Sequence, residues 1–152
     1  MAIQLPPPPG AEQAYDVAAA KLADQLKQID SLDQKLGVVI GAIVVAIAAF
    51  AAAPLTGWPK VLIAVGLAVA LAPALAAFLV GQYEDAPRPE IMVEYADLNA
   101  NAMKWQALGA VLRAFEINEP KVRNKGRLLN ISLSVAAVLG LLVLLGKGAG
   151  LA

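Results

Sequence analysis

The side chains of this 152-residue chain that could do acid–base or metal chemistry are carboxylates, because the sequence contains no histidine and no cysteine. A helix that begins at Pro89 would place three of them on one face, where their oxygens could bind a divalent cation. Such a face is more often simply solvated, so we predict no metal site, no cofactor and no catalytic residue. The densest carboxylate set is Glu84, Asp85, Glu90, Glu94 and Asp97.

The composition also argues against whole classes of function. Without imidazole and thiolate groups the chain cannot build zinc sites, ligate haem or chlorophyll-type pigments through histidine, or form disulfides. It has no glycine-rich phosphate loop and no Glu-x-x-His motif. Twelve basic side chains balance twelve acidic ones, and nucleic-acid binding requires a strongly basic face. We therefore expect neither an enzyme nor a nucleic-acid-binding protein.

Three apolar runs dominate the sequence, which is 59% apolar. Residues 36–53 and 61–81 carry no charged side chain, and residues 128–146 form a third run that is polar only at Asn130, Ser132 and Ser134. At about 1.5 Å per residue, each run crosses most of the ~30 Å hydrocarbon layer of a bilayer. The sequence predicts an all-α integral membrane protein with three transmembrane helices.

The segments outside these runs predict a cytoplasmic helical layer. Residues 11–35 contain no Pro or Gly and form an amphipathic helix that continues into the first span. Its apolar stripe needs a partner, either a helix over residues 99–118 or a second copy of itself. The predicted cytoplasmic stripe comprises Leu22, Leu26, Ile29 and Leu32 on the first segment and Trp105, Leu108, Leu112 and Phe115 on the second.

The remaining segments are two tails and a connection. Residues 1–10 form a proline-rich tail and residues 147–152 a glycine-containing one, while residues 82–127 connect the second and third spans. Residues 90–97 of this connection are expected to make two helical turns. We expect Pro120 to break or bend the helix that precedes the third span.

Small residues spaced three or four apart recur in each span, and they allow helix backbones to approach closely in lipid. They predict packing within one chain or a seam between copies. Pro73 is expected to kink the second span. The predicted helix-packing residues are Gly37 and Gly41 in the first span, Gly66 and Ala70 in the second, and Ser132, Ala136 and Gly140 in the third.

The distribution of Lys and Arg predicts the orientation. Three lie in the N-terminal segment and seven in the second connection, against Lys60 and Lys147 on the other side. Segments rich in Lys and Arg stay on the cytoplasmic side of a membrane. We therefore expect a multi-pass protein of the cell inner membrane with the N-terminus in the cytoplasm and the C-terminus outside. The basic cluster before the third span either sets this topology or contacts lipid headgroups. Its members are Lys121, Arg123, Lys125 and Arg127.

The order of these segments resembles small bacterial membrane effectors of the SLATT and Pycsar transmembrane types. The resemblance rests on residues 29–35 (IDSLDQK) against a two-span hairpin, and on residues 112–118 (LRAFEIN) leading through Lys121 and Lys125 into a further apolar run. It implies a protein that oligomerises in the membrane and compromises it during anti-phage defence. This sequence departs from the type by its third span and by having no recognisable nucleotide-sensing domain.

The spans contain no ionisable side chain of the kind that ion or proton transport uses. We therefore expect a non-catalytic accessory or anchoring subunit of a larger membrane assembly, which contacts lipid and other membrane protein subunits or copies of itself. A self-associating membrane effector and a small channel or transporter are the alternatives.

Overall fold

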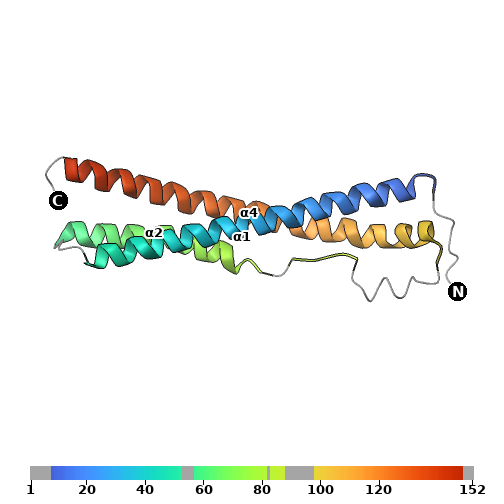
Figure 1. Ribbon diagram of the computed structural model, residues 1–152, viewed down its shortest axis with the longest axis horizontal. Helices are drawn as coiled ribbons and strands as arrows, with labels where there is room; N and C mark the ends of the chain where they lie inside the picture. The colour runs from blue at the N-terminus through green and yellow to red at the C-terminus, as the bar shows by residue number, and fades with distance from the viewer. Residues whose placement is uncertain (1–7, 53–56, 82, 88–97, 149–152) are drawn as a thin grey trace. The chain divides into compact units, whose positions relative to one another are not determined.

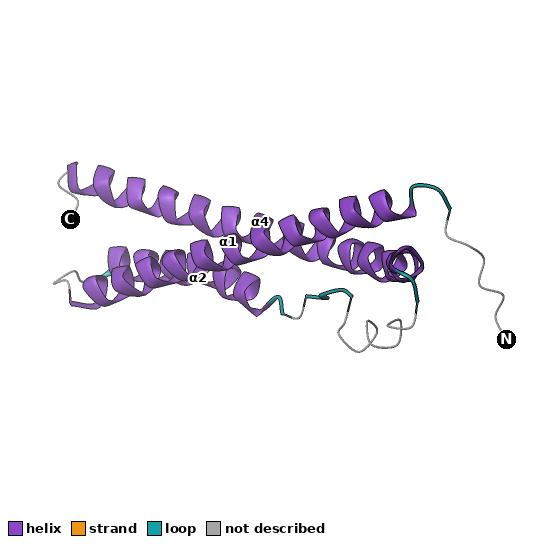
Figure 2. Ribbon diagram, turned by 45° about the vertical axis from the view of Figure 1, so that its right-hand side comes forward, coloured by secondary structure: helices purple, strands orange, loops and turns teal. Residues whose placement is uncertain are grey.

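The computed structural model describes residues 8–52, 57–81, 83–87 and 98–148. These residues form three helices, α1 (Ala11–Ala52), α2 (Trp58–Leu79) and α4 (Ala100–Gly148), and the described part of the chain contains no strand (Figures 1 and 2). The expected turns over residues 90–97, with Glu90, Glu94 and Asp97, lie outside the described residues. So do most of the proline-rich tail and the end of the C-terminal tail.

Helix α1 is a single helix of 42 residues. It follows Gly10, whose φ of 88° is a backbone conformation that glycine adopts without steric cost. The Ala11 N–H donates to the Pro8 carbonyl, and Glu12 places a negative charge in the first turn, where the helix dipole favours it. No proline or glycine interrupts the segment before Gly37, so nothing divides its polar half from its apolar half.

Helix α4 is longer than the sequence predicts, with 49 residues that include Pro120. Pro120 was expected to break or bend the helix, and a break is wrong because α4 continues through it. A proline removes one N–H from the hydrogen-bond ladder, and helical segments of about 20 residues or more on either side are long enough to continue through that gap. The helix begins after Asn99, whose Oδ1 accepts a hydrogen bond from the Ala102 N–H at 2.9 Å, the usual contact of an N-cap.

Helix α2 follows Gly57, which has a φ of 79°, and carries a proline in its first two positions. Pro59 there costs no hydrogen bond, because the first N–H groups of a helix have no partner within it. Pro73 lies inside the helix, which continues to Leu79.

The described residues separate into two units. The first unit comprises residues 1–29 and 82–122, and the second comprises residues 30–81 and 123–152. In the first unit α1 packs on α4 through Ala18, Leu22, Val111 and Ala114. In the second unit α2 lies beside α1 and α4, and the core is Leu36, Ala74, Ala77 and Leu129 (Figure 1).

All three helices are long and apolar enough to cross a membrane. Their most apolar 18-residue windows are only 11%, 17% and 11% buried within the chain. Most residues of these windows are therefore not fully buried by the protein itself.

Candidate functional site

A lysine and an aspartate form an ion pair inside the second unit. Lys125 of α4 is 1% exposed, and its Nζ lies 2.5 Å from Oδ1 of Asp33 on α1. An ammonium group buried away from water needs a counter-charge, which this carboxylate supplies. The Asp33 side chain is 39% exposed, so water reaches the pair from the aspartate side. Each partner lies three residues before an uncharged run of the sequence.

The core of the second unit lies next to this pair in the sequence. Leu36 and Leu129 are buried against Ala74 and Ala77 of α2, and Leu32 packs on the same cluster. The two alanines have side chains of one methyl group, which lets α2 approach the larger leucines closely.

A second polar contact joins α4 to α2. The Ser132 hydroxyl is fully buried and donates a hydrogen bond of 2.7 Å to the Ala70 carbonyl. Nearby, a Cβ added at Gly66 would overlap the side chain of Leu139. Glycine is therefore required at this position unless Leu139 moves.

The structure divides the predicted helix-packing residues into two groups. Gly66, Ala70 and Ser132 lie where α2 meets α4, and Ala136 is half-buried. Three others are exposed, and a Cβ added at any of them would meet nothing within 4 Å; they are Gly37, Gly41 and Gly140.

The predicted cytoplasmic stripe is also divided. Leu22 and Ile29 are buried, and Leu26, Leu108 and Phe115 are partly buried, all in the first unit. Leu32 belongs to the second unit, and Trp105 and Leu112 are 40% and 47% exposed.

On α4 the buried row of the first unit is made of small side chains and one amide. It comprises Ala107, Val111, Ala114 and Asn118, which follow one another at spacings of four, three and four. The sequence prediction assigned the largest apolar side chains of this segment to the buried face. Two closely packed helices instead bury small side chains between them. The same spacing rule applied to alanine and valine would have found this row.

Asn118 is fully buried and holds the chain segment that follows α2. The Glu84 N–H donates to Asn118 Oδ1 at 2.9 Å, and Asn118 Nδ2 donates to the Glu84 carbonyl at 2.7 Å. One amide thus satisfies both backbone groups of Glu84, as a neighbouring strand would. An isolated asparagine within a helix carries no sequence signal for this role, and the prediction missed it.

Two further polar contacts tie α1 to α4 in the first unit. Gln25 is buried, and its Nε2 donates to the Phe115 carbonyl at 3.3 Å. Lys104 Nζ lies 2.8 Å from Glu12 and 3.0 Å from Asp16. Its hydrogen bonds to Glu12 and then to Asp16 raise the pKa of the Lys104 ammonium above its ordinary value of 10.5.

The four predicted headgroup residues lie in different environments. Lys125 is buried in its ion pair, and Lys121 lies 5.9 Å from the centre of the Tyr83 ring. Arg123 and Arg127 are exposed. Residues two apart in a helix differ by about 200° in direction, so successive members of the cluster face opposite ways.

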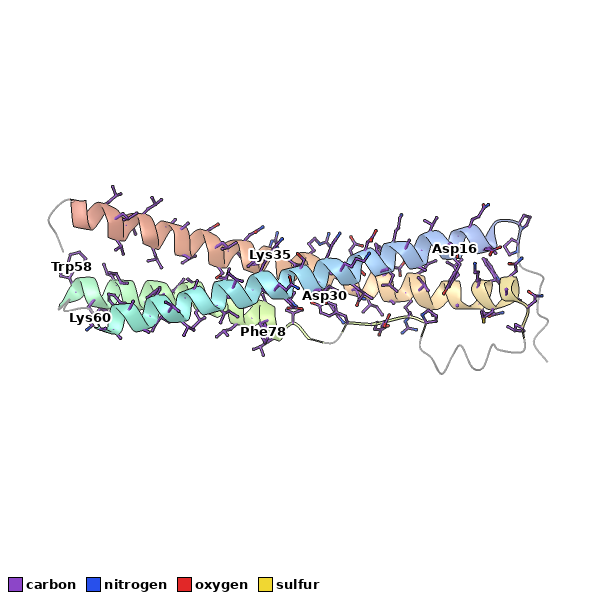
Figure 3. The ribbon with its side chains drawn as sticks, in the orientation of Figure 1. Asp16, Asp30, Lys35, Trp58, Lys60 and Phe78 are labelled. Carbon is purple, nitrogen blue, oxygen red and sulfur yellow. The ribbon has the colours of Figure 1, made fainter. Side chains whose placement is uncertain are left out.

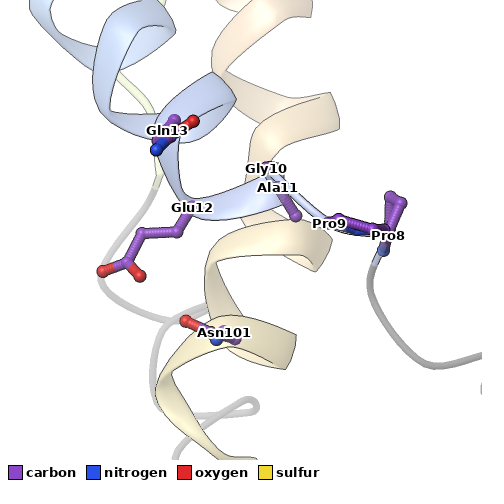
Figure 4. Close-up of a pocket in the computed structure, with 7 residues that line it drawn as sticks. All are labelled: Pro8, Pro9, Gly10, Ala11, Glu12, Gln13 and Asn101. Carbon is purple, nitrogen blue, oxygen red and sulfur yellow. The ribbon is translucent and has the colours of Figure 1, made fainter.

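Two hollows occur in the described surface. One, of about 600 Å³, follows α4 in the second unit and is lined chiefly by Arg123, Arg127, Asn130 and Ser134. The other, of about 250 Å³, lies where α1 and α4 begin (Figure 4). Glu12, which lines the smaller hollow beside Asn101, is already bonded to Lys104.

Within residues 8–52, 57–81, 83–87 and 98–148, no three carboxylates gather as a metal ion would require. Glu84 and Asp85 belong to the described part, and the other three members of the predicted set do not.

The sequence matches no family model, and no curated protein and no solved structure is significantly similar to it. The resemblance to the SLATT and Pycsar effectors stays a prediction.

Proposed function

We propose that this chain is an integral membrane protein that acts without catalysis, through helix packing, as an accessory or anchoring subunit of a larger membrane assembly. The observation that carries the proposal is the outward display of large apolar side chains over the second unit. They include Val38, Val45, Val61, Phe78, Leu79, Leu144 and Leu145, each more than half exposed. Phe78 projects away from α2 (Figure 3). Soluble monomers rarely expose apolar patches larger than a few hundred Å², whereas lipid covers such a surface at no cost.

The start of α2 supports a position at a membrane interface. Trp58 is 72% exposed there and is followed closely by Lys60. Tryptophan and lysine are typical anchors at the level of the lipid headgroups. Ten of the twelve Lys and Arg residues fall outside the segments near Lys60 and Lys147. This bias favours the inner membrane, with a cytoplasmic N-terminus and an external C-terminus.

The buried polar side chains already make structural contacts within the chain, and this favours a role in assembly over a role in catalysis. Asn118 holds the segment after α2, Lys125 pairs with Asp33, and Ser132 joins α4 to α2. These groups connect the helices of the chain. The apolar exterior of the second unit is exposed and available to other membrane components.

The test is photo-crosslinking in the native membrane, with a photoreactive amino acid at Val38, Val61 or Leu144. An accessory subunit gives a crosslink to one different protein from one of these faces, while the others give lipid adducts. Reporter fusions near Lys60 and at the two ends measure the orientation. Extraction of the chain by alkaline carbonate, or lipid adducts from all faces, would refute the proposal.

A second candidate is a membrane effector that associates with itself, and the exposed pair Gly37 and Gly41 favours it. A glycine pair four residues apart, with open space around it, allows the close approach of another helix in lipid. Under this hypothesis Val38 crosslinks to a second copy, and the purified chain releases dye from liposomes. G37L/G41L should abolish both effects, whereas A46L, at an exposed position on the opposite side of α1, should not.

A further inference from the structure

Helix α4 has two opposite polar faces in the second unit. One contains Lys125 and Ser132, which are buried against the other helices. The other contains four exposed polar side chains at spacings of four, three and four, namely Arg123, Arg127, Asn130 and Ser134. At 100° per residue these four fall within about 60° of one another and lie about 180° from Lys125 and Ser132. The polar residues of this outer face therefore have no role in the packing of this unit.

The outer face carries a shallow, open depression of about 600 Å³, and all the residues that line it belong to α4. Beside the four polar side chains, Ile131 and Val135 form its apolar part. Asn130 and Ser134 lie within the apolar run 128–146. A polar side chain that faces hydrocarbon is unfavourable unless a polar group bonds to it.

The order of these side chains along α4 matches the layers of one lipid molecule. The headgroup region of a leaflet is about 5–8 Å deep, half the difference between the full bilayer and its hydrocarbon core. Asn130 follows Arg127 by about 4.5 Å along the helix, within the headgroup region, whereas Ser134 follows it by about 10.5 Å and lies below that region. A phosphate beside the two guanidinium groups would thus bring the ester oxygens of the same lipid level with Asn130. Its acyl chains would then lie beside Ser134 and Val135.

We propose that this outer face of α4 binds the headgroup of one acidic phospholipid of the cytoplasmic leaflet, an inference that rests on the membrane insertion proposed above. Arg123 and Arg127 bind the phosphate, since a guanidinium offers paired N–H donors that fit its oxygens. Asn130 donates to the ester oxygens. Lys125 takes no part in binding and is a positioning residue, because its ion pair with Asp33 turns the two arginines outward.

The experiment measures phospholipid binding to the purified full chain in detergent by native mass spectrometry, with phosphatidylglycerol and phosphatidylcholine as probes. Each basic side chain near an anionic leaflet strengthens binding about fivefold, so R123Q/R127Q should weaken phosphatidylglycerol binding about 30-fold. The matched control is K21Q/K27Q, which removes the same charge from exposed positions of α1 in the first unit. N130L should weaken both lipids alike, because both carry ester oxygens.

One tightly bound phosphatidylglycerol per chain, lost in R123Q/R127Q and kept in K21Q/K27Q, would support the site. Equal losses in both double variants would show a general effect of charge and overturn it. Displacement of the lipid by an equal concentration of inorganic phosphate would identify a free-phosphate site instead. A dimer that N130L abolishes would show that a second copy occupies this face.

Liposome integration is measured in parallel and separates the two proposals. A chain that fails to resist an alkaline wash of the liposomes refutes the membrane proposal, and the lipid site with it. A chain that integrates, but binds phosphatidylglycerol and phosphatidylcholine equally, refutes the lipid site alone.

Discussion

The ion pair between Asp33 and Lys125 should respond unequally to loss of its two partners. In D33N the Lys125 ammonium, 1% exposed, loses the carboxylate beside it. Removing one partner of a fully buried pair costs about 3–5 kcal/mol. The Asp33 side chain is 39% exposed, and water reaching it screens the interaction, so we expect a smaller loss, of about 2 kcal/mol in the free energy of unfolding.

In K125M the outcome should differ. Methionine has a similar length and no charge, and the remaining carboxylate of Asp33 is reached by water. We therefore expect a change within about 1 kcal/mol. The double variant D33N/K125M should be about as stable as K125M, because once the ammonium is gone the carboxylate has no partner to stabilise.

The free energy can be measured in mild detergent by steric trapping, in which streptavidin binds two biotin labels only after the chain unfolds. The chain has no cysteine, so cysteines introduced at Ser31 and Asn124, which are exposed and lie outside the apolar runs, give unambiguous labels. D30N removes a charge from a nearby exposed position and should stay within about 0.5 kcal/mol of the parent. Equal losses in D33N and K125M, or none in D33N, would refute the buried-pair explanation.

Three further outcomes are expected in the same system. N118L should destabilise the first unit by about 2 kcal/mol, since it leaves backbone groups without partners, and should speed hydrogen exchange at the Glu84 amide. G66A should cost about 1 kcal/mol because it displaces a packed leucine, whereas G37A, in open space, should cost nothing measurable. Because the pKa of Lys104 is raised in the folded chain, its ion pairs stabilise the chain fully below pH 10.5, and this stabilisation is lost as the pH rises through the raised value. In K104Q the unfolding midpoint should therefore change less between about pH 9 and 12 than it does in the parent.

The helical architecture could be predicted from the sequence because it depends on long uninterrupted patterns. Residues 11–52 contain no proline, and the three apolar runs are each long enough to dictate a helix regardless of neighbours. The break expected at Pro120 does not occur. Proline removes one backbone hydrogen bond, but the other hydrogen bonds of this 49-residue helix continue on both sides of it.

The candidate site was only partly predictable, for a different reason. Lys121, Arg123, Lys125 and Arg127 look like one cluster in the sequence, yet their spacing of two distributes them over opposite sides of a helix. Which side is buried depends on where α1 approaches, and no property of residues 121–127 encodes this. The contact of Asn118 with Glu84 likewise depends on the path of the segment after α2.

The buried ion pair links the order of synthesis to the completion of the fold. Asp33 belongs to α1 and Lys125 to α4, so a ribosome delivers the aspartate before the lysine. Until α4 arrives, the aspartate must remain hydrated. A newly made α4 likewise carries an ammonium group that resists leaving water until the aspartate accepts it. The two partners therefore differ before they meet: Asp33 keeps its contact with water in either state, whereas Lys125 can be buried only once α1 supplies the carboxylate.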